Sequence, residues 1–168
     1  MCGIYGLIRR DGDIDAARLA RQRDLLTHRG PNDAGSWVSP DGRVGLAHRR
    51  LSILDLTAAG HQPMTSQDGR FTIVFNGEIY NYREIRAELE KVGRTFYTGT
   101  DTEVLLAAYK IWGESCLARL NGMFAFAIHD AGDAGIPPTL FLARDRAGKK
   151  PLYYAFDGHR LEFASGLK

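Results

Sequence analysis

The chain has 168 residues, of which 44% are hydrophobic and 25% are charged, a balance typical of one globular domain with its own core. Its formal net charge of +2, without any run of Lys or Arg, argues against nucleic acid or an anionic membrane surface as a partner. No apolar run approaches a membrane span, no signal-peptide pattern is present, and two cysteines make no disulfide framework, so we expect a soluble cytoplasmic domain.

Short apolar runs and helical periodicity predict an α+β fold. In chain order we expect a strand at 4–9, a helix at 15–27, strands at 35–38, 43–47 and 71–75, two helices, and strands at 123–129, 139–143, 152–156 and 161–164. The two central helices are predicted to begin after Asn81 and Thr100, because each is followed three residues later by glutamate, as in a capping box. A long hairpin loop is expected at 130–138. Helices between groups of strands favour helices packed on antiparallel sheet.

Cys2 is the sharpest chemical feature. Removal of Met1, which the small second residue favours, would place a thiol and a free α-amine on one residue. The amine titrates at about 7.7–8.0 and the thiol at about 8.5, so the amine can act as the base for its own nucleophile. With Met1 retained, the nitrogen is a peptide amide and cannot be a base. The alternative is that Cys2 is a small hydrophobe opening a buried strand.

The dipeptide Asn76-Gly77 follows an apolar run, so we expect it at the end of a strand. Acyl transfer needs two donors aimed at the developing oxyanion, which an Asn side chain and a backbone N–H can supply. Gly also lets the backbone approach a ligand closely. An Asn-Gly hairpin turn is the alternative, although the following residues lead into a helix and not into a return strand.

Three charged residues could bind an amino acid. A guanidinium suits an α-carboxylate and carboxylates suit an α-ammonium, so Arg50 can hold the first group and Glu78 and Asp101 the second. The alternatives are a solvated surface arginine and an acidic residue that favours a helix N-terminus.

Other candidate sites lack the required pattern. The five histidines have no metal-ligand spacing, and neither a P-loop nor Gly-x-Gly-x-x-Gly occurs. Cys116 lies among apolar residues and is expected to be a core thiol. Asp145 is expected in a structural turn or an ion pair.

Six ordered blocks resemble one known family. They are MCGI at 1–4, HRGPN at 28–32, RLSILD at 50–55, FNGEIYN at 75–81, TGTDTE at 98–103 and RDRAGKKPLYY at 144–154. Together they are similar to the N-terminal glutaminase domain of glutamine-hydrolysing asparagine synthetases, a class II glutamine amidotransferase, over essentially the whole chain. Two positions depart from the family pattern: Ala147, where a larger apolar residue is usual, and Gly166, where Glu is common.

The resemblance implies an N-terminal-nucleophile hydrolase fold, a four-layer αββα sandwich with two antiparallel sheets, as one glutaminase domain over residues 1–168. It also implies a role for each site residue: the nucleophile Cys2, the oxyanion hole Asn76 and Gly77, the α-carboxylate ligand Arg50, the α-ammonium ligands Glu78 and Asp101, and Ile53, whose backbone would line the pocket.

The implied reaction is hydrolysis of L-glutamine to glutamate and ammonia through a Cys2 γ-glutamyl thioester. The ammonia would pass to an ATP-dependent synthetase domain or subunit, as in asparagine biosynthesis. The glutaminase itself is expected to need no cofactor, with ATP and Mg confined to the synthetase domain, which this sequence lacks. Two alternatives stay open: the same chemistry serving another amidation acceptor, and a non-catalytic glutamine-binding module if Met1 is retained.

Overall fold

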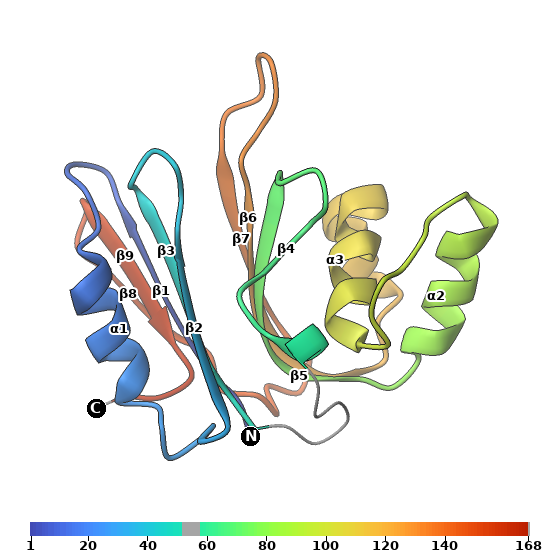
Figure 1. Ribbon diagram of the computed structural model, residues 1–168, viewed down its shortest axis with the longest axis horizontal. Helices are drawn as coiled ribbons and strands as arrows, with labels where there is room; N and C mark the ends of the chain where they lie inside the picture. The colour runs from blue at the N-terminus through green and yellow to red at the C-terminus, as the bar shows by residue number, and fades with distance from the viewer. Residues whose placement is uncertain (52–57, 168) are drawn as a thin grey trace.

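The computed structural model describes residues 1–51 and 58–167, which form four layers in the order helix, sheet, sheet, helix (Figure 1). Both sheets are antiparallel. The predicted α+β sandwich of two antiparallel sheets between helix layers is therefore confirmed.

The first sheet has five strands in the order β2-β3-β1-β9-β8. Their bounds are Gly3–Arg9 for β1, Asp33–Val38 for β2, Val44–Arg50 for β3, Tyr153–Phe156 for β8 and Arg160–Ala164 for β9. β1 lies between β3 and β9, so strands from both ends of the chain meet at the centre of this sheet.

The second sheet has four strands in the order β4-β5-β6-β7. Their bounds are Met64–Thr65 for β4, Phe71–Ile79 for β5, Gly122–Asp130 for β6 and Thr139–Arg144 for β7. β5 and β6 pair over nine residues each, and this long ladder is the rigid centre of the sheet.

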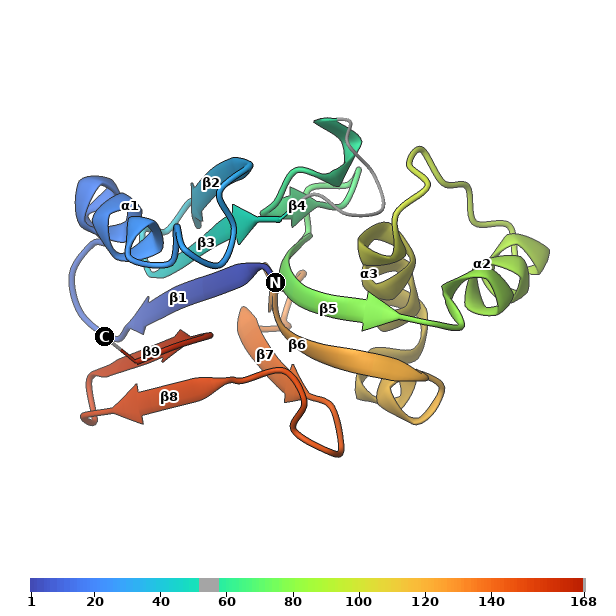
Figure 2. The ribbon, with the colours of Figure 1, turned by 90° about the horizontal axis from the view of Figure 1, so that it is seen from below.

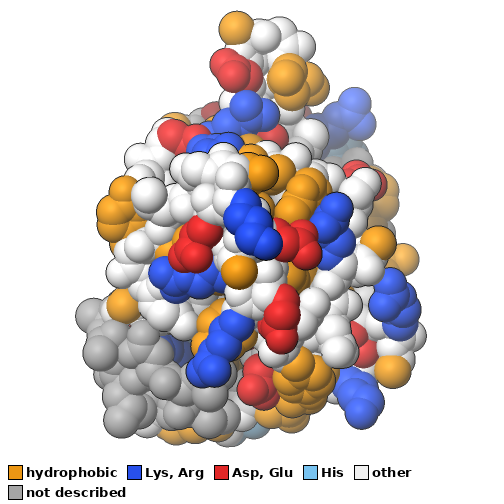
Figure 3. Space-filling model, turned by 90° about the vertical axis from the view of Figure 1, so that its right-hand side faces the viewer, with side chains coloured by type: hydrophobic (Ala, Val, Ile, Leu, Met, Phe, Trp, Pro, Cys, Tyr) orange, Lys and Arg blue, Asp and Glu red, His pale blue; other side chains and the backbone are white. Residues whose placement is uncertain are grey.

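Helices cover the outer face of each sheet. Helix α1, Ala16–Asp24, packs on the first sheet, while α2, Tyr82–Lys91, and α3, Asp101–Trp112, lie on the side of the second (Figure 1). Two short 3₁₀ helices, Ala58–Gly60 and Gly113–Ala118, complete the described elements. On the face formed by α2 and α3, basic and acidic side chains are interspersed, which fits the small net charge (Figure 3).

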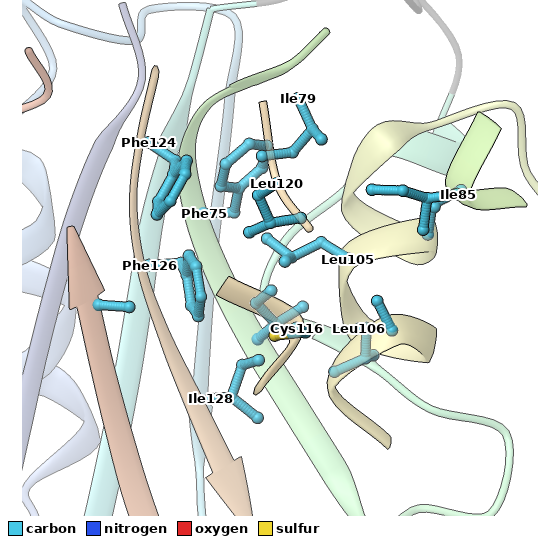
Figure 4. Close-up of a cluster of buried hydrophobic side chains, with 14 of the residues drawn as sticks. Phe75, Ile79, Ile85, Leu105, Leu106, Cys116, Leu120, Phe124, Phe126 and Ile128 are labelled. Carbon is cyan, nitrogen blue, oxygen red and sulfur yellow. The ribbon is translucent and has the colours of Figure 1, made fainter. Parts of the chain in front are cut away.

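Three apolar clusters fill the spaces between the layers. The largest lies between the second sheet and its helices; Phe75, Phe126, Leu105 and Cys116 belong to it (Figure 4). A second cluster lies between the two sheets and contains Ile4, Leu46, Val74, Ala125, Ala127 and Phe163. The third joins α1 to the first sheet. Cys116 is fully buried, as predicted, and burial raises the pKa of its thiol to about 11.

Several boundaries differ from the prediction. The expected strand at 71–75 continues to Ile79, so Asn76-Gly77 lies inside β5 and not at its end. The helix expected at 15–27 ends at Asp24. The two-residue strand β4 and the 3₁₀ helix at 113–118 were not predicted, because neither is long enough to show periodicity.

The two predicted capping boxes are each only partly correct. Thr100 caps α3 as expected, since its Oγ1 accepts the N–H of Glu103 at 3.3 Å. The Glu103 carboxylate turns instead to the N–H groups of Tyr97 and Thr98. α2 begins after Asn81 as expected, but the side chain of Asn81 makes no cap bond. It bonds the main chain of the 119–121 segment instead.

The topology places the N-terminus between the two sheets. Seen from below, the start of β1 meets β5 and β6 at the centre of the molecule (Figure 2). Residue 2 therefore lies where side chains of both sheets can reach it.

Candidate functional site

A cavity of about 300 Å³ opens at the start of β1. Six of the seven predicted site residues line it: Cys2, Arg50, Asn76, Gly77, Glu78 and Asp101. The seventh, Ile53, lies outside the described residues. Larger cavities of about 470 and 450 Å³ contain none of the predicted residues. The topology thus brings together residues that are up to 99 positions apart in the chain.

Cys2 is held by neighbours on both its main chain and its side chain. Its carbonyl accepts the Nε–H of Arg29 at 3.2 Å, and its Sγ accepts the N–H of Leu51 at 3.4 Å. The thiol is partly buried, whereas Met1 is 54% exposed. Met1 is therefore accessible for removal, and the sulfur stays at the cavity wall.

The side chain of Asn76 faces the space between the sheets. Side chains alternate along a strand; Phe75 belongs to the helix-side cluster and Val74 to the inter-sheet cluster, so Asn76 points in the same direction as Val74. Asn76 is 1% exposed, and its Nδ2 has no hydrogen-bond partner among residues 1–51 and 58–167. A buried amide donor without an acceptor is costly unless a ligand supplies one.

The N–H of Gly77 points away from β6. Opposite Gly77, Phe124 uses both its N–H and its carbonyl to bond Asp145, on the far side of β6. Gly77 and Phe124 therefore form a non-hydrogen-bonded pair, and the polar groups of Gly77 face the other edge of β5. On this edge the N–H of Phe75 donates to Gln62 and that of Ile79 to Asp101.

Gly77 is required by a close approach of two strands. A Cβ at this position would lie 2.3 Å from the carbonyl oxygen of Met123 on β6. The hairpin-turn alternative for Asn76-Gly77 is wrong, because both residues pair within the β5–β6 ladder. Glycine was expected here because it leaves room for a ligand. The tertiary structure adds a second reason, the close approach of β5 and β6.

Arg50 packs against the short 3₁₀ helix at the cavity. Its residue is 9% exposed, and a Cβ on Gly60 would meet Nη2 at 2.0 Å, so the glycine leaves room for the guanidinium. In the register of β2 and β3, Arg50 lies opposite Asp33. The alternative of a solvated surface arginine is wrong.

Two carboxylates line the same cavity. Asp101 is the first residue of α3, and its Oδ2 accepts the N–H of Ile79 at 3.0 Å. Burial raises the pKa of Asp101 above its ordinary value, and the nearby charge of Glu78 raises it further. A pair of carboxyl groups at one cavity is well suited to a cationic ligand.

Several cavity residues were missed by the sequence reasoning. Gln62, Thr102, Met123 and Lys150 also line the cavity, and the sequence analysis assigned a role to none of them. Asp145 was expected in a turn or ion pair, and the turn is correct. Burial favours its neutral form, yet the backbone N–H groups of Lys150, Lys149, Phe124 and Ala147 together lower the pKa of Asp145.

Two kinds of feature are absent from the part of the chain that is described. No group of three or more His, Cys, Asp or Glu there could hold a metal ion. No described helix is long and apolar enough to cross a membrane.

Comparisons with known proteins give one family match and several similar sequences. A family described as a glutamine amidotransferase domain matches residues 1–168. The chain is 43% identical over 172 residues to asparagine synthetase [glutamine-hydrolyzing] 1 of Bacillus subtilis, covering 100% of this chain and 26% of that protein. It is 40% identical to putative asparagine synthetase [glutamine-hydrolyzing] 2 of Methanocaldococcus jannaschii, covering 100% and 34% respectively. The chain thus spans about a quarter to a third of these relatives.

A solved structure matches the fold. It is the glutamine phosphoribosylpyrophosphate amidotransferase of B. subtilis, with a TM-score of 0.76 over 98% of this chain and 42% of that one. The sequence identity is 22%, so this likeness concerns the fold alone.

Proposed function

The chain belongs to the glutamine amidotransferase domain family, and from this premise we propose that it hydrolyses L-glutamine to glutamate and ammonia with Cys2 as the nucleophile. The observation that carries the proposal is a pair of adjacent donors, Asn76 Nδ2–H and Gly77 N–H, at the cavity that Cys2 lines. Within the described residues Asn76 Nδ2 has no hydrogen-bond partner.

The first half of the reaction forms a thioester. Once Met1 is removed, the free α-amine of Cys2 takes the thiol proton, and the sulfur attacks the side-chain amide carbon of glutamine. The carbonyl oxygen becomes an oxyanion that accepts hydrogen bonds from Asn76 and Gly77. Each such donor is worth about 2.7–4 kcal/mol of transition-state stabilisation. The Cys2 ammonium then protonates the leaving nitrogen, the C–N bond breaks, and ammonia departs.

The second half releases glutamate. The same α-amine takes a proton from water, and the resulting hydroxide attacks the thioester carbonyl through a second oxyanion in the same hole. The C–S bond breaks, and the proton on the amine returns to the sulfur. One water is consumed, and Cys2 is regenerated as thiol and amine.

Charged groups at the cavity hold the amino-acid end of glutamine. Arg50 binds the α-carboxylate through its planar guanidinium. Glu78 and Asp101 bind the α-ammonium, whose positive charge favours the ionised form of Asp101. The backbone at Ile53 lines the pocket. Ground-state binding is thus assigned to Arg50, Glu78 and Asp101, separate from the donors that act in the transition state.

We propose that the ammonia serves an ATP-dependent synthetase domain of the asparagine synthetase type. Support comes from the names and lengths of the relatives, which are asparagine synthetases about three to four times as long as this chain. Residues 1–168 would then be the glutaminase domain, without a cofactor of its own. ATP and Mg would bind only to the synthetase part.

The test is intact mass spectrometry before and after treatment with 6-diazo-5-oxo-norleucine, a glutamine analogue that alkylates the nucleophile, with glutamate release measured in parallel. We expect loss of Met1, a single adduct that maps to Cys2, and no turnover in Cys2→Ala. Cys116 is an internal control, because it is fully buried and the pKa of its thiol is about 11.

Two results would contradict the proposal. Met1 removed, with neither adduct nor turnover, would show that Cys2 is not the nucleophile. Met1 retained, with glutamine bound but not hydrolysed, would identify a glutamine-binding module instead.

A further inference from the structure

Gln62 is a buried side chain that joins three elements at the cavity. It is 6% exposed, and its Oε1 accepts the N–H of Phe75 at 2.6 Å. Its Nε2 donates to Oγ1 of Thr102 at 3.3 Å, in the first turn of α3. Because its oxygen must face the Phe75 N–H and its nitrogen then meets the Thr102 hydroxyl, the amide has one favoured orientation.

Gln62 and Asp101 hold the two N–H groups that flank Gly77. Along this edge of β5 the N–H groups of Phe75, Gly77 and Ile79 point away from β6. Gln62 accepts from Phe75, and Asp101 accepts from Ile79 at 3.0 Å. Both acceptors are anchored in the first turn of α3, Asp101 directly and Gln62 through Thr102. The N–H between them is the proposed oxyanion donor.

The peptide after Phe75 is held by a side chain of the first sheet. His48, on β3, contacts the carbonyl oxygen of Phe75 through Nε2 at 3.1 Å, and this nitrogen must donate because a carbonyl only accepts. His48 is 1% exposed and pairs with Ile4, two residues after Cys2. Both peptide groups around Phe75 are therefore fixed by side chains, immediately before Asn76 begins.

We propose that Gln62 is a positioning residue of the oxyanion hole: by holding the N–H of Phe75, it aims the Asn76 amide and the Gly77 N–H at the substrate oxygen. The kinetic part of this inference rests on the proposed glutaminase function. Misplacing a catalytic group by about 1 Å costs about 10²-fold in rate. Because the hole stabilises the transition state and not bound glutamine, the loss falls on kcat and not on KM.

The test compares three near-isosteric variants of the 168-residue chain. Gln62→Met removes both hydrogen bonds and is expected to lower kcat about 10- to 100-fold, with KM changed less than about threefold. Thr102→Val leaves Gln62 in place but removes the hydroxyl to which its Nε2 donates, and it is expected to lower kcat about three- to tenfold. Thr72→Val is the matched control. Thr72 lies on the same strand, is fully buried, and bonds Thr65 at 3.1 Å far from the hole, so kcat and KM stay unchanged.

A second readout does not depend on turnover. In ¹⁵N-resolved NMR spectra, Gln62→Met and Thr102→Val should shift the amide resonance of Gly77, whereas Thr72→Val should leave it in place. If Gln62→Met does not fold, Thr102→Val carries both measurements.

The outcomes separate this inference from the proposed function. A wild-type protein without Cys2-dependent turnover contradicts the glutaminase, while the Gly77 resonance still tests Gln62. A wild-type kcat in Gln62→Met, a raised KM at constant kcat, or an unmoved Gly77 resonance overturns the positioning role even where turnover is intact.

Discussion

Replacing Gly77 with alanine perturbs the proposed oxyanion hole without removing any polar group. The new Cβ would lie 2.3 Å from the carbonyl oxygen of Met123, 2.7 Å from Cα of Phe124 and 2.8 Å from Cε2 of Phe75. Ordinary contact begins at 3.4 Å, so the main chain of β5 must withdraw from β6 by 3.4 − 2.3 = 1.1 Å at this point. Two of the three obstructing atoms are backbone and cannot rotate away.

This displacement moves the Gly77 N–H itself. We expect kcat for glutamine hydrolysis to fall about 10²-fold, because the donor is displaced by about the distance that degrades a positioned group. KM should change less than kcat, since the ligands proposed for the amino-acid end of glutamine are other side chains, those of Arg50, Glu78 and Asp101. Overpacking of this kind also costs about 1–3 kcal/mol of unfolding free energy.

Steady-state glutamate release and urea unfolding check both effects. Gly166→Ala is the matched control, because a Cβ there meets only Cδ2 of Leu26 at 3.9 Å. The reasoning would be refuted by a folded Gly77→Ala protein with at least half of the wild-type kcat. The reasoning would also be refuted if the fraction of kcat that is lost were no larger than the fraction of Gly77→Ala molecules that is unfolded under the assay conditions.

Three further predictions concern single residues. Asn76→Asp keeps the shape but loses the buried donor, so kcat should fall about 10²–10³-fold in the same assay; a loss below about tenfold would exclude this donor. In Asp101→Asn the side chain can still accept the N–H of Ile79, but its negative charge is lost. A hydrogen bond to a charged group is worth about 1.5–3 kcal/mol, so KM for glutamine should rise at least about tenfold. An unchanged KM would show that Asp101 does not bind the α-ammonium. Burial lowers the pKa of His48 from 6.5 to about 4. As the pH falls, His48 is therefore protonated in the unfolded chain before it is protonated in the folded protein. The stability that neutral His48 contributes is complete above pH 6.5 and is lost as the pH falls to about 4. His48→Gln still offers a donor to the carbonyl of Phe75 and should remove this part of the acid sensitivity. The unfolding free energy measured in urea should then lose about 3 kcal/mol less across this pH range than in the wild-type protein. An equal dependence of the unfolding free energy on pH in both proteins would contradict the prediction.

The sequence predicted most of the described strands well. The expected bounds of β1, β6, β7, β8 and β9 are within one residue at each end. β5 was cut short after Phe75 because Asn and Gly usually mark turns. The strand continues because tertiary contacts satisfy that edge: Gln62 and Asp101 take N–H groups that no neighbouring strand reaches. These partners come from distant parts of the chain and leave no local signal.

In the candidate site, too, some residues could be predicted from the sequence and others could not. Residue chemistry alone pointed to Cys2, Arg50 and Asn76, because each side chain has a specific task in amide hydrolysis. Gln62 could not be found in this way, since its importance lies in which backbone group it touches and not in its reactivity. Glu103 is the opposite case, in which a local motif predicted a contact that does not form. Its carboxylate was expected in a capping box but accepts N–H groups of the preceding loop instead.

The proposed nucleophile lies at the start of the first sheet, and the proposed oxyanion donors lie in the second. Cys2 precedes β1 of the first sheet, while Asn76 and Gly77 lie within β5 of the second. The thickness of the apolar layer between the sheets therefore affects the separation between the Cys2 sulfur and the Asn76-Gly77 pair. Ala125 and Ala127, both fully buried in that layer, keep it thin. Under the proposed mechanism, we therefore expect the rate of glutamine hydrolysis to depend on the spacing between the sheets. Core substitutions that change this spacing should alter the rate even when every polar group of the cavity stays in place.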